Sequence, residues 1–193
     1  MNNKLQAKDL INVGIFTAIY FVVFFVCGML GYVPILFILV PAYFPIITGI
    51  PFMLFLTKVK TFGMVTIMSI LCGILMFATG HSWVPVVTAC VCGVLADLVF
   101  KAGDYRSLKH TVIGYGIFSI WPIGAALPMW LMRDSYFEYI RSSMGDEYAN
   151  ALLSLTPNWI PYAFVAVAFI AGIIGAYVGK AILKKHFRKA GIA

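Results

Sequence analysis

The chain has 193 residues, of which 62% are apolar and only 11% are Asp, Glu, Lys or Arg. Soluble domains average about 25% charged residues, and the mean hydropathy of this chain is +0.97. The composition therefore excludes a water-soluble fold, and it equally excludes disorder and a collagen-like structure. A membrane span takes about 20 apolar residues, which leaves room for at most about six spans. We predict an all-α membrane protein, with residues 1–193 forming a single transmembrane domain.

Six apolar runs follow one another along the chain, and each predicts a transmembrane helix. They cover residues 10–30, 33–57, 63–78, 83–100, 111–132 and 159–183. The first run is longer than the apolar region of a signal peptide and has no A-x-A cleavage site, so we expect a retained helix. The second run contains several prolines, which interrupt helical hydrogen bonding. We therefore expect its first part to be an irregular loop folded onto the protein.

Basic residues are divided unequally between the two sides of this six-span scheme. The outer side has only Arg133 and Arg141. The side that holds both termini has the other twelve: Lys4, Lys8, Lys58, Lys60, Lys101, Arg106, Lys109, Lys180, Lys184, Lys185, Arg188 and Lys189. The positive-inside rule therefore predicts a multi-pass protein of the cell membrane with both termini in the cytoplasm. Because membrane topology accounts for the net charge of +7, we expect no nucleic-acid partner.

One external connection, residues 132–158, is long enough to have structure of its own. Its pattern predicts two short amphipathic helices, the first over 135–141 and closed by Gly145. The second covers 147–155, with Asp146 as its cap, and ends before a proline. This segment has two interpretations at this stage: an anchor at the membrane interface, or a lid over a cavity that faces outward.

The spans lack the clustered ionisable residues that a membrane enzyme needs. Asp97 is the only acid inside a run, and its spacing from Lys101 predicts an ion pair, with a functional intramembrane acid as the alternative. Cys90 and Cys92 are two residues apart and point to different faces of a helix, which disfavours a metal site. The sequence has no H-E-x-x-H, G-x-S-x-G or Walker A motif. We predict no catalytic site, no cofactor and no metal, and any ATP hydrolysis would come from another chain.

Small residues recur at the spacing that lets membrane helices approach closely. Gly14 and Ala18 are four residues apart in the first run. In the last run, one stripe comprises 168, 172 and 176, and a neighbouring stripe comprises 175 and 179. We interpret the stripes of the last run as internal packing, and the pair in the first run as a docking surface for a partner.

Tryptophans gather toward the outer side, whereas an ordinary aromatic belt would occupy both interfaces. Such rings, with a few polar groups, suit an outer cavity for a flat or amphipathic ligand. The predicted substrate-binding residues are Trp83, Trp121, Trp159, Arg133, His81 and Asn158. Arg133 would pair with a carboxylate or phosphate of the ligand. His81 would donate a hydrogen bond or bind a ligand metal, unless it is only the polar tip of a turn. A one-sided aromatic belt is the alternative.

Seven stretches together carry a resemblance to a known family. They are GIFTA (14–18), GIPFMLFLTK (49–58), TGHSW (79–83), ADL (96–98), MRDSYF (132–137), DEYAN (146–150) and KHF (185–187). With six spans and a small-residue stripe on the first, the chain resembles the S component of an energy-coupling factor (ECF) transporter. It resembles the Trep_Strep group, also labelled MptD-like, most closely.

The resemblance implies a membrane subunit that captures a scarce micronutrient outside the cell. It would dock through Gly14 and Ala18 on a transmembrane T component and topple to release its cargo inside, driven by two cytoplasmic ATPases. Vitamin-like compounds are the usual cargo, and the aromatic residues, His81 and nine methionines also admit a haem-type tetrapyrrole. The rival interpretation is a membrane scaffold or assembly factor that uses the same stripes and carries no ligand.

Overall fold

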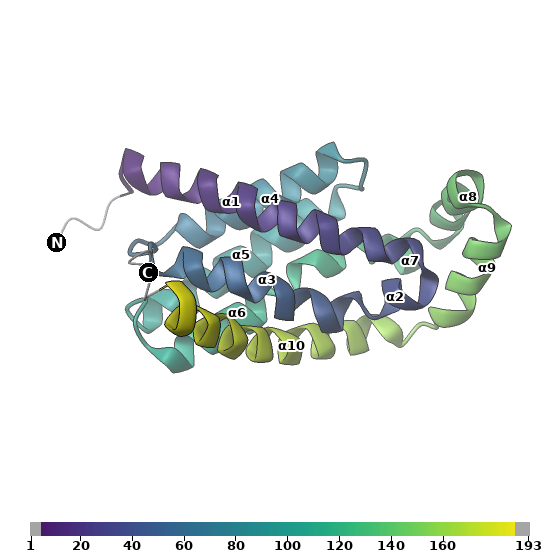
Figure 1. Ribbon diagram of the computed structural model, residues 1–193. Coiled ribbons are helices and arrows are strands. Elements are labelled where there is room, and N and C mark those ends of the chain that lie inside the picture. The colour runs from purple at the N-terminus through teal and green to yellow at the C-terminus, as the bar shows by residue number, and fades with distance from the viewer. Residues whose placement is uncertain (1–4, 188–193) are drawn as a thin grey trace.

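The computed structural model describes residues 5–187, and all regular secondary structure in that stretch is helical (Figure 1). This confirms the predicted all-α class. The helices are α1 (Ala7–Gly28), η1 (Met29–Tyr32), α2 (Pro34–Ile38), α3 (Val40–Leu56), α4 (Met64–Ala78), α5 (Val84–Ala102), α6 (Leu108–Phe118), η2 (Trp121–Ala125), α7 (Pro128–Leu131), α8 (Arg133–Met144), α9 (Asp146–Leu155), α10 (Ile160–Ile182) and η3 (Leu183–Phe187).

Three helical stretches within the described residues are long and apolar enough to cross a membrane. They are Ala7–Tyr32, Val84–Ala102 and Ile160–Lys185, with 26, 19 and 26 residues. Helices α3 and α4 are equally apolar but shorter, at 17 and 15 residues. At about 1.5 Å of rise per residue, they are shorter than the roughly 30 Å hydrocarbon core.

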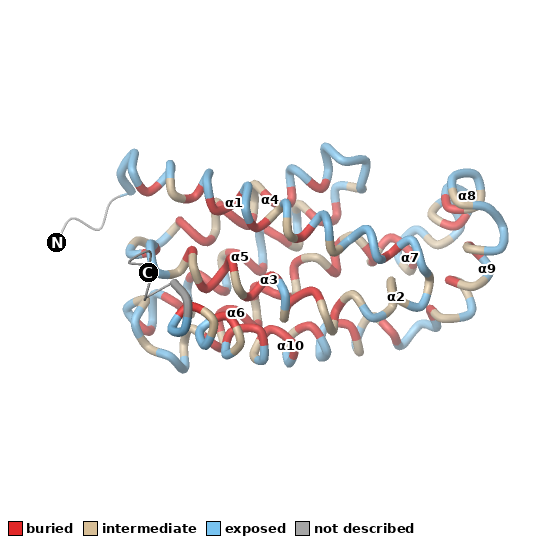
Figure 2. The backbone as a smooth tube through the Cα atoms, in the orientation of Figure 1, coloured by how far each residue is buried: buried red, intermediate tan, exposed pale blue. Residues whose placement is uncertain are grey.

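Helices α1, α3, α4, α5, α6 and α10 form one elongated bundle, with buried residues along their inner faces (Figure 2). Phe52 of α3 lies at its centre, with its ring 4.3 Å from that of Phe118 and 4.7 Å from that of Tyr115. Helix α10 lies so close to α3 that a Cβ added at Gly179 would be 2.5 Å from the carbonyl oxygen of Gly49. The predicted role of the α10 small residues in internal packing is thus confirmed.

The second predicted span differs from expectation, because its first part is helical. After the short helix α2, the chain bends at Leu39 and continues as α3 through Pro45 and Pro51. Proline is favourable in the first turn of a helix, where Pro41 lies. The hydroxyl of Tyr115, on the neighbouring helix α6, donates a hydrogen bond to the carbonyl of Pro45 in α3 at 2.7 Å. Neighbouring helices therefore stabilise a segment that proline alone would interrupt.

The fifth predicted span is also different, because residues 111–132 do not form one continuous helix. Helix α6 ends at Phe118, and the chain continues as η2 and α7, each of which has a proline in its first turn. The interruption lies against α5, where the Thr88 hydroxyl donates to the carbonyl of Trp121 at 2.8 Å. Irregular backbone is tolerated at such a place because the protein itself surrounds it.

Asp97 does not form the predicted ion pair with Lys101, whose ammonium lies over the ring of Phe62. The fully buried carboxylate of Asp97 instead caps the start of α4. It accepts hydrogen bonds from the backbone N–H groups of Gly63 at 2.8 Å and Thr66 at 3.1 Å, and from the Thr66 hydroxyl at 3.0 Å. An acid at a helix N-terminus is favoured by the helix dipole, so Asp97 has a structural role.

Tyr105 supplies the fourth hydrogen bond to this carboxylate, at 2.9 Å. It lies in a turn in which Asp104 and Tyr105 have φ values of 49° and 55°, a conformation that side chains rarely adopt. Burial and the neighbouring Asp97 carboxylate raise the pKa of Tyr105 above its ordinary value, so the phenol stays protonated and can donate. The α5–α6 turn thereby completes the cap on α4.

Replacing Asp97 with alanine should destabilise the fold. Each buried donor left without a partner costs about 1–3 kcal/mol, so even the low end of this range gives a loss of about 4 kcal/mol for the four donors. Tyr105→Phe removes one of the four bonds and should cost about 1 kcal/mol. Thermal unfolding in detergent measures both. The exposed Asp104, changed to Asn, is the control and should leave the midpoint unchanged; an equal midpoint for Asp97→Ala would contradict the structural role.

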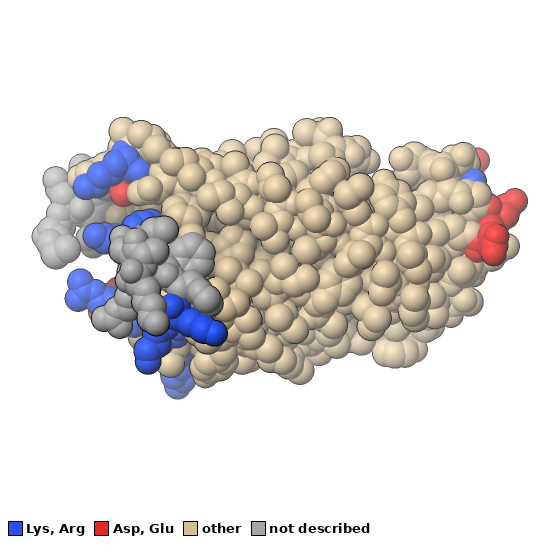
Figure 3. Space-filling view, in the orientation of Figure 1, with Lys and Arg blue, Asp and Glu red and all other residues tan. Residues whose placement is uncertain are grey.

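Charge is segregated between the two ends of the bundle (Figure 3). Lys and Arg gather at the end that holds Ala7 of α1 and the α3–α4 and α5–α6 connections. The helical hairpin α8–α9 forms the opposite end, where Asp and Glu dominate the visible surface. Three of the twelve residues assigned to the basic side, Lys4, Arg188 and Lys189, lie outside the described residues.

Candidate ligand-binding cavity

A cavity of about 310 Å³ lies at the hairpin end of the bundle. Its walls come from the end of α1 with η1, from α2 and the start of α3, from η2, from α10, and from α8–α9. Cavities for small molecules in proteins have about this volume or more. The sequence analysis expected a ligand at this end of the molecule, in an outer cavity that residues 132–158 would cover as a lid.

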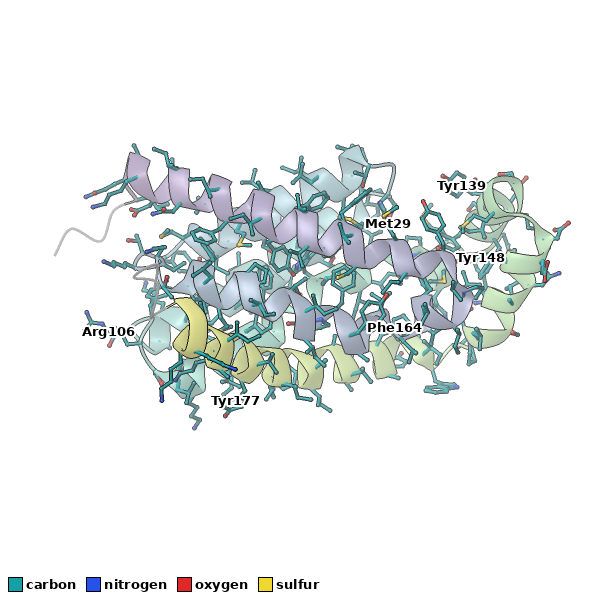
Figure 4. All side chains as sticks on the ribbon, in the orientation of Figure 1. Met29, Arg106, Tyr139, Tyr148, Phe164 and Tyr177 are labelled. Carbon is teal, nitrogen blue, oxygen red and sulfur yellow. The ribbon has the colours of Figure 1, made fainter. Side chains whose placement is uncertain are left out.

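Aromatic rings form much of the cavity wall. Phe24 of α1 lies between two other rings, with its centroid 4.4 Å from that of Phe44 and 5.1 Å from that of Trp121. Phe164 of α10 meets Trp130 edge-on at 5.9 Å and lines another part of the wall (Figure 4). Such an arrangement offers ring faces and edges to an apolar ligand, because aromatic pairs favour offset and edge-on contacts.

The α8–α9 hairpin covers one side of the cavity. The helices meet at Gly145, whose φ of 86° favours glycine. The Arg141 guanidinium joins them, donating to Asp146 at 2.7 Å and to Asn150 at 2.8 Å. The sequence analysis expected Asp146 to cap α9. Its side chain instead binds Arg141, and the cap position is Gly145.

Tyr148 connects this hairpin to the body of the protein. Its hydroxyl donates to the carbonyl of Gly31 at 2.7 Å, across a separation of 117 residues. Figure 4 shows Tyr148 on the hairpin and Met29 at the end of α1, and both line the cavity. The bond holds α9 against η1 on one side of the cavity, as expected for the lid interpretation of residues 132–158.

The polar groups of the cavity wall are uncharged at neutral pH. Although His81 is exposed as a residue, partial desolvation of its ring lowers the pKa of the imidazole below its ordinary value, which favours the neutral ring at pH 7. Burial raises the pKa of the Tyr136 and Tyr148 phenols, so both stay protonated. Ser119 donates to the carbonyl of Tyr115 at 2.7 Å. These groups can position a ligand through a few hydrogen bonds.

Of the six predicted ligand residues, the structure places His81 in the wall of this cavity. Trp83 and Trp159 lie outside it, 61% and 62% exposed, and Asn158 is also exposed. Trp121 is fully buried behind Phe24, and its indole N–H has no hydrogen-bond partner within the described residues. The structure therefore does not bring the three predicted tryptophans together.

Arg133 also lies outside the cavity. Its Nη1 donates to the carbonyls of Met129 at 3.4 Å and Thr156 at 3.3 Å, and the guanidinium lies over the ring of Phe137. It borders a separate hollow with Asp134. These contacts tie α8 to the neighbouring segments, and the Phe137 ring, 5.5 Å from that of the wall residue Tyr136, is the one that Arg133 covers.

The sequence analysis did not single out several of the residues that form the wall. Phe24, Phe44 and Phe164 are single rings within apolar runs, and nothing in such a run tells a cavity wall from a packed core. Tyr136 and Ile140 did carry a signal, since their spacing of four places them on one face of an amphipathic helix.

Gly14 and Ala18 lie far from the cavity, on an outward face of α1. Both are exposed, and a Cβ added at Gly14 meets no atom within 4 Å. Only 28% of the most apolar part of α1 is buried, against 39% for the other two long helices. The small-residue pair in this helix is therefore available to another chain, unlike the buried stripes of α10.

No group of three or more His, Cys, Asp or Glu side chains that could hold a metal occurs within residues 5–187.

Comparison with known proteins identifies a family. Residues 7–189 match the family described as hypothetical bacterial integral membrane protein (Trep_Strep). The chain belongs to this family. The Trep_Strep match covers nearly all of the chain, and the apolar helices accord with an integral membrane protein. No curated protein and no solved structure matches it.

Proposed function

We propose that this Trep_Strep protein is the substrate-binding S component of an ECF-type importer in the cell membrane. The cavity of about 310 Å³ under the α8–α9 hairpin carries the proposal. A scaffold or assembly factor has no need for an aromatic-walled cavity closed by a hydrogen-bonded hairpin. The ligand would be a scarce micronutrient, a vitamin-like compound or a haem-type tetrapyrrole.

In this proposal the protein catalyses no reaction, and other chains supply the energy. The exposed pair Gly14 and Ala18 would contact a transmembrane T component, because small residues allow close helix approach in lipid. Two ATPases would act at the basic end of the bundle, in the cytoplasm. The proposal includes a six-span topology, in which α1, α3, α4, α5, the α6–α7 segment and α10 would each cross the bilayer; the length and apolarity of α1, α5 and α10 support three of these spans.

Two measurements test the function. Mass spectrometry of material extracted from the purified protein should find one enriched small molecule. Affinity purification from the native bacterium should recover a T component and two ATPases. An empty protein that associates with neither would favour the scaffold interpretation.

The proposed topology predicts which side of the membrane each end of the bundle faces. In a variant without the four native cysteines, a cysteine at Gly145 should react with a membrane-impermeant thiol reagent in intact cells. A cysteine at Arg106 should react only after the cells are opened, because the basic side is expected in the cytoplasm. Labelling in the reverse order would show that the orientation is wrong.

A further inference from the structure

The cavity wall is predominantly apolar. Among the described residues that line it there is no Asp, Glu, Lys or Arg. Carbon and sulfur groups surround the space, including the rings of Phe24, Phe44 and Phe164 and the thioethers of Met29 and Met76. At the mouth, Met29 is 55% exposed and Tyr32 is 68% exposed, so the entrance is also lined by large apolar groups.

On helix α8, beside the cavity, apolar and charged residues lie on different faces. Tyr136, Ile140 and Met144 follow one another at intervals of four residues, and all three line the cavity. The ionic residues of the same helix border a separate shallow hollow: Arg133, Asp134, Glu138 and Arg141. Arg141 binds Asp146 and Asn150, so its charge is held on the hairpin and away from the aromatic wall.

A charged ligand group in such a space would have no counter-charge. Moving an ion from water into a poorly polar interior costs several kcal/mol unless it is paired and hydrogen-bonded. A neutral group meets no such cost, and contact with apolar walls favours it by about 25 cal/mol per Å² of apolar surface removed from water.

From these observations we infer that the part of the ligand that enters this cavity is uncharged and largely apolar. Any ionic group of the ligand stays outside the mouth. The inference rests on the proposed substrate-binding function and specifies its substrate class. It departs from the earlier expectation that Arg133 pairs with a ligand carboxylate or phosphate, since that side chain contacts other residues outside the cavity.

The few polar groups in the wall suit a neutral ligand atom. His81 contacts the Thr79 hydroxyl through Nδ1 at 3.3 Å, and a neutral imidazole has one donor and one acceptor nitrogen. The Ser119 hydroxyl already donates to the Tyr115 carbonyl, so its oxygen can accept a further bond. A hydroxyl group on an otherwise apolar ligand can donate to the Ser119 oxygen, whereas a ligand carbonyl can only accept a bond.

A matched pair of probes tests the inference. 9-Anthracenemethanol is neutral, and anthracene-9-carboxylate has the same ring system with a negative charge. Energy transfer from tryptophan to anthracene reports binding, and Trp121 is the natural donor because it stacks on the cavity residue Phe24 at 5.1 Å. Changing the other tryptophans, at positions 83, 130 and 159, to phenylalanine leaves Trp121 as the single donor.

Two glycines of α1 provide a matched pair of variants. Gly28 lines the cavity and Gly14 does not, and a Cβ at either position meets no atom within 4 Å. Gly28→Phe should therefore fold normally and obstruct the cavity, while Gly14→Phe adds the same side chain to the outer face of the same helix. Thermal unfolding of both variants checks that the fold is intact.

We expect saturable binding of 9-anthracenemethanol that Gly14→Phe leaves unchanged and Gly28→Phe weakens at least tenfold, about 1.4 kcal/mol. The carboxylate should bind at least tenfold more weakly than the alcohol. Equal or tighter binding of the carboxylate would overturn the inference. A signal that Gly28→Phe does not change would also overturn the inference, because it would come from probe dissolved in detergent. The absence of saturable binding would overturn it as well.

These outcomes are distinct from failure of the proposed function. A protein that binds the neutral probe in its cavity but recovers no T component or ATPase supports the inference and contradicts the importer. A protein that supports uptake with its partners but prefers the carboxylate supports the importer and contradicts the inference.

Discussion

Replacing both Gly14 and Ala18 with leucine is expected to reduce uptake to background while ligand binding by the purified subunit persists. Both positions are exposed on α1, and neither lines the cavity. Leucine would keep a partner helix from the close approach that small residues allow. Uptake by cells that express the complete transporter, and recovery of the T component with the tagged subunit, measure the effect.

A neighbouring exposed face of α1 provides the control. Ile15 and Ile19 are 53% and 42% exposed and already bulky, so Ile15→Leu and Ile19→Leu should leave uptake unchanged. If the Gly14→Leu, Ala18→Leu double variant keeps full uptake, the pair faces lipid and the T component docks elsewhere. Loss of ligand binding in that variant would instead indicate damage to the fold.

The sequence predicts the helices well where one physical signal dominates. Long apolar runs without interior proline become α1, α4, α5 and α10 within a few residues of the predicted limits. The hairpin α8–α9 is also recognisable, because Gly145 interrupts two amphipathic patterns and has the positive φ that glycine favours. Local sequence decides these elements.

The prediction is wrong where tertiary contacts decide the local structure. The prolines of the 33–57 run predict an irregular first part, but the chain there forms α2 and α3. Contacts with α6 and α10 support α3 through Pro45 and Pro51. Asp97 is four residues before Lys101, yet its carboxylate receives donors from the α4 N-terminus more than 30 residues away along the chain. Sequence spacing does not reveal such distant partners.

The region of the cavity is predictable, but its wall is not. An excess of aromatic residues on the outer side indicates where a ligand would bind. It does not say which rings point inward, because α1 and α10 are apolar on both their buried and exposed faces. Trp83 and Phe24 are equally apolar in the sequence, yet Trp83 is 61% exposed and Phe24 is 5% exposed.

Except for His81, the cavity wall and the site predicted from the sequence consist of different residues. The second prediction distinguishes the two sites. We expect Phe44→Leu and Phe164→Leu together to lower the affinity for 9-anthracenemethanol, and for any ligand extracted from the protein, at least tenfold. Each ring contact contributes about 0.5–1.5 kcal/mol beyond area burial, and about 1.4 kcal/mol corresponds to tenfold. Leucine keeps most of the side-chain volume, which limits the damage to packing.

Trp83→Ala and Trp159→Ala form the opposing pair of variants. The sequence analysis predicts that each loses tenfold or more, whereas their exposure outside the cavity predicts little change. Binding titrations of the phenylalanine double variant and of the two tryptophan variants, with thermal unfolding to verify the fold, decide between the two sites. Loss of affinity in the phenylalanine double variant alone would place the ligand in the cavity, against the start of α3 and the wall that α10 provides. Loss in the tryptophan variants alone would move the site to the outer rim.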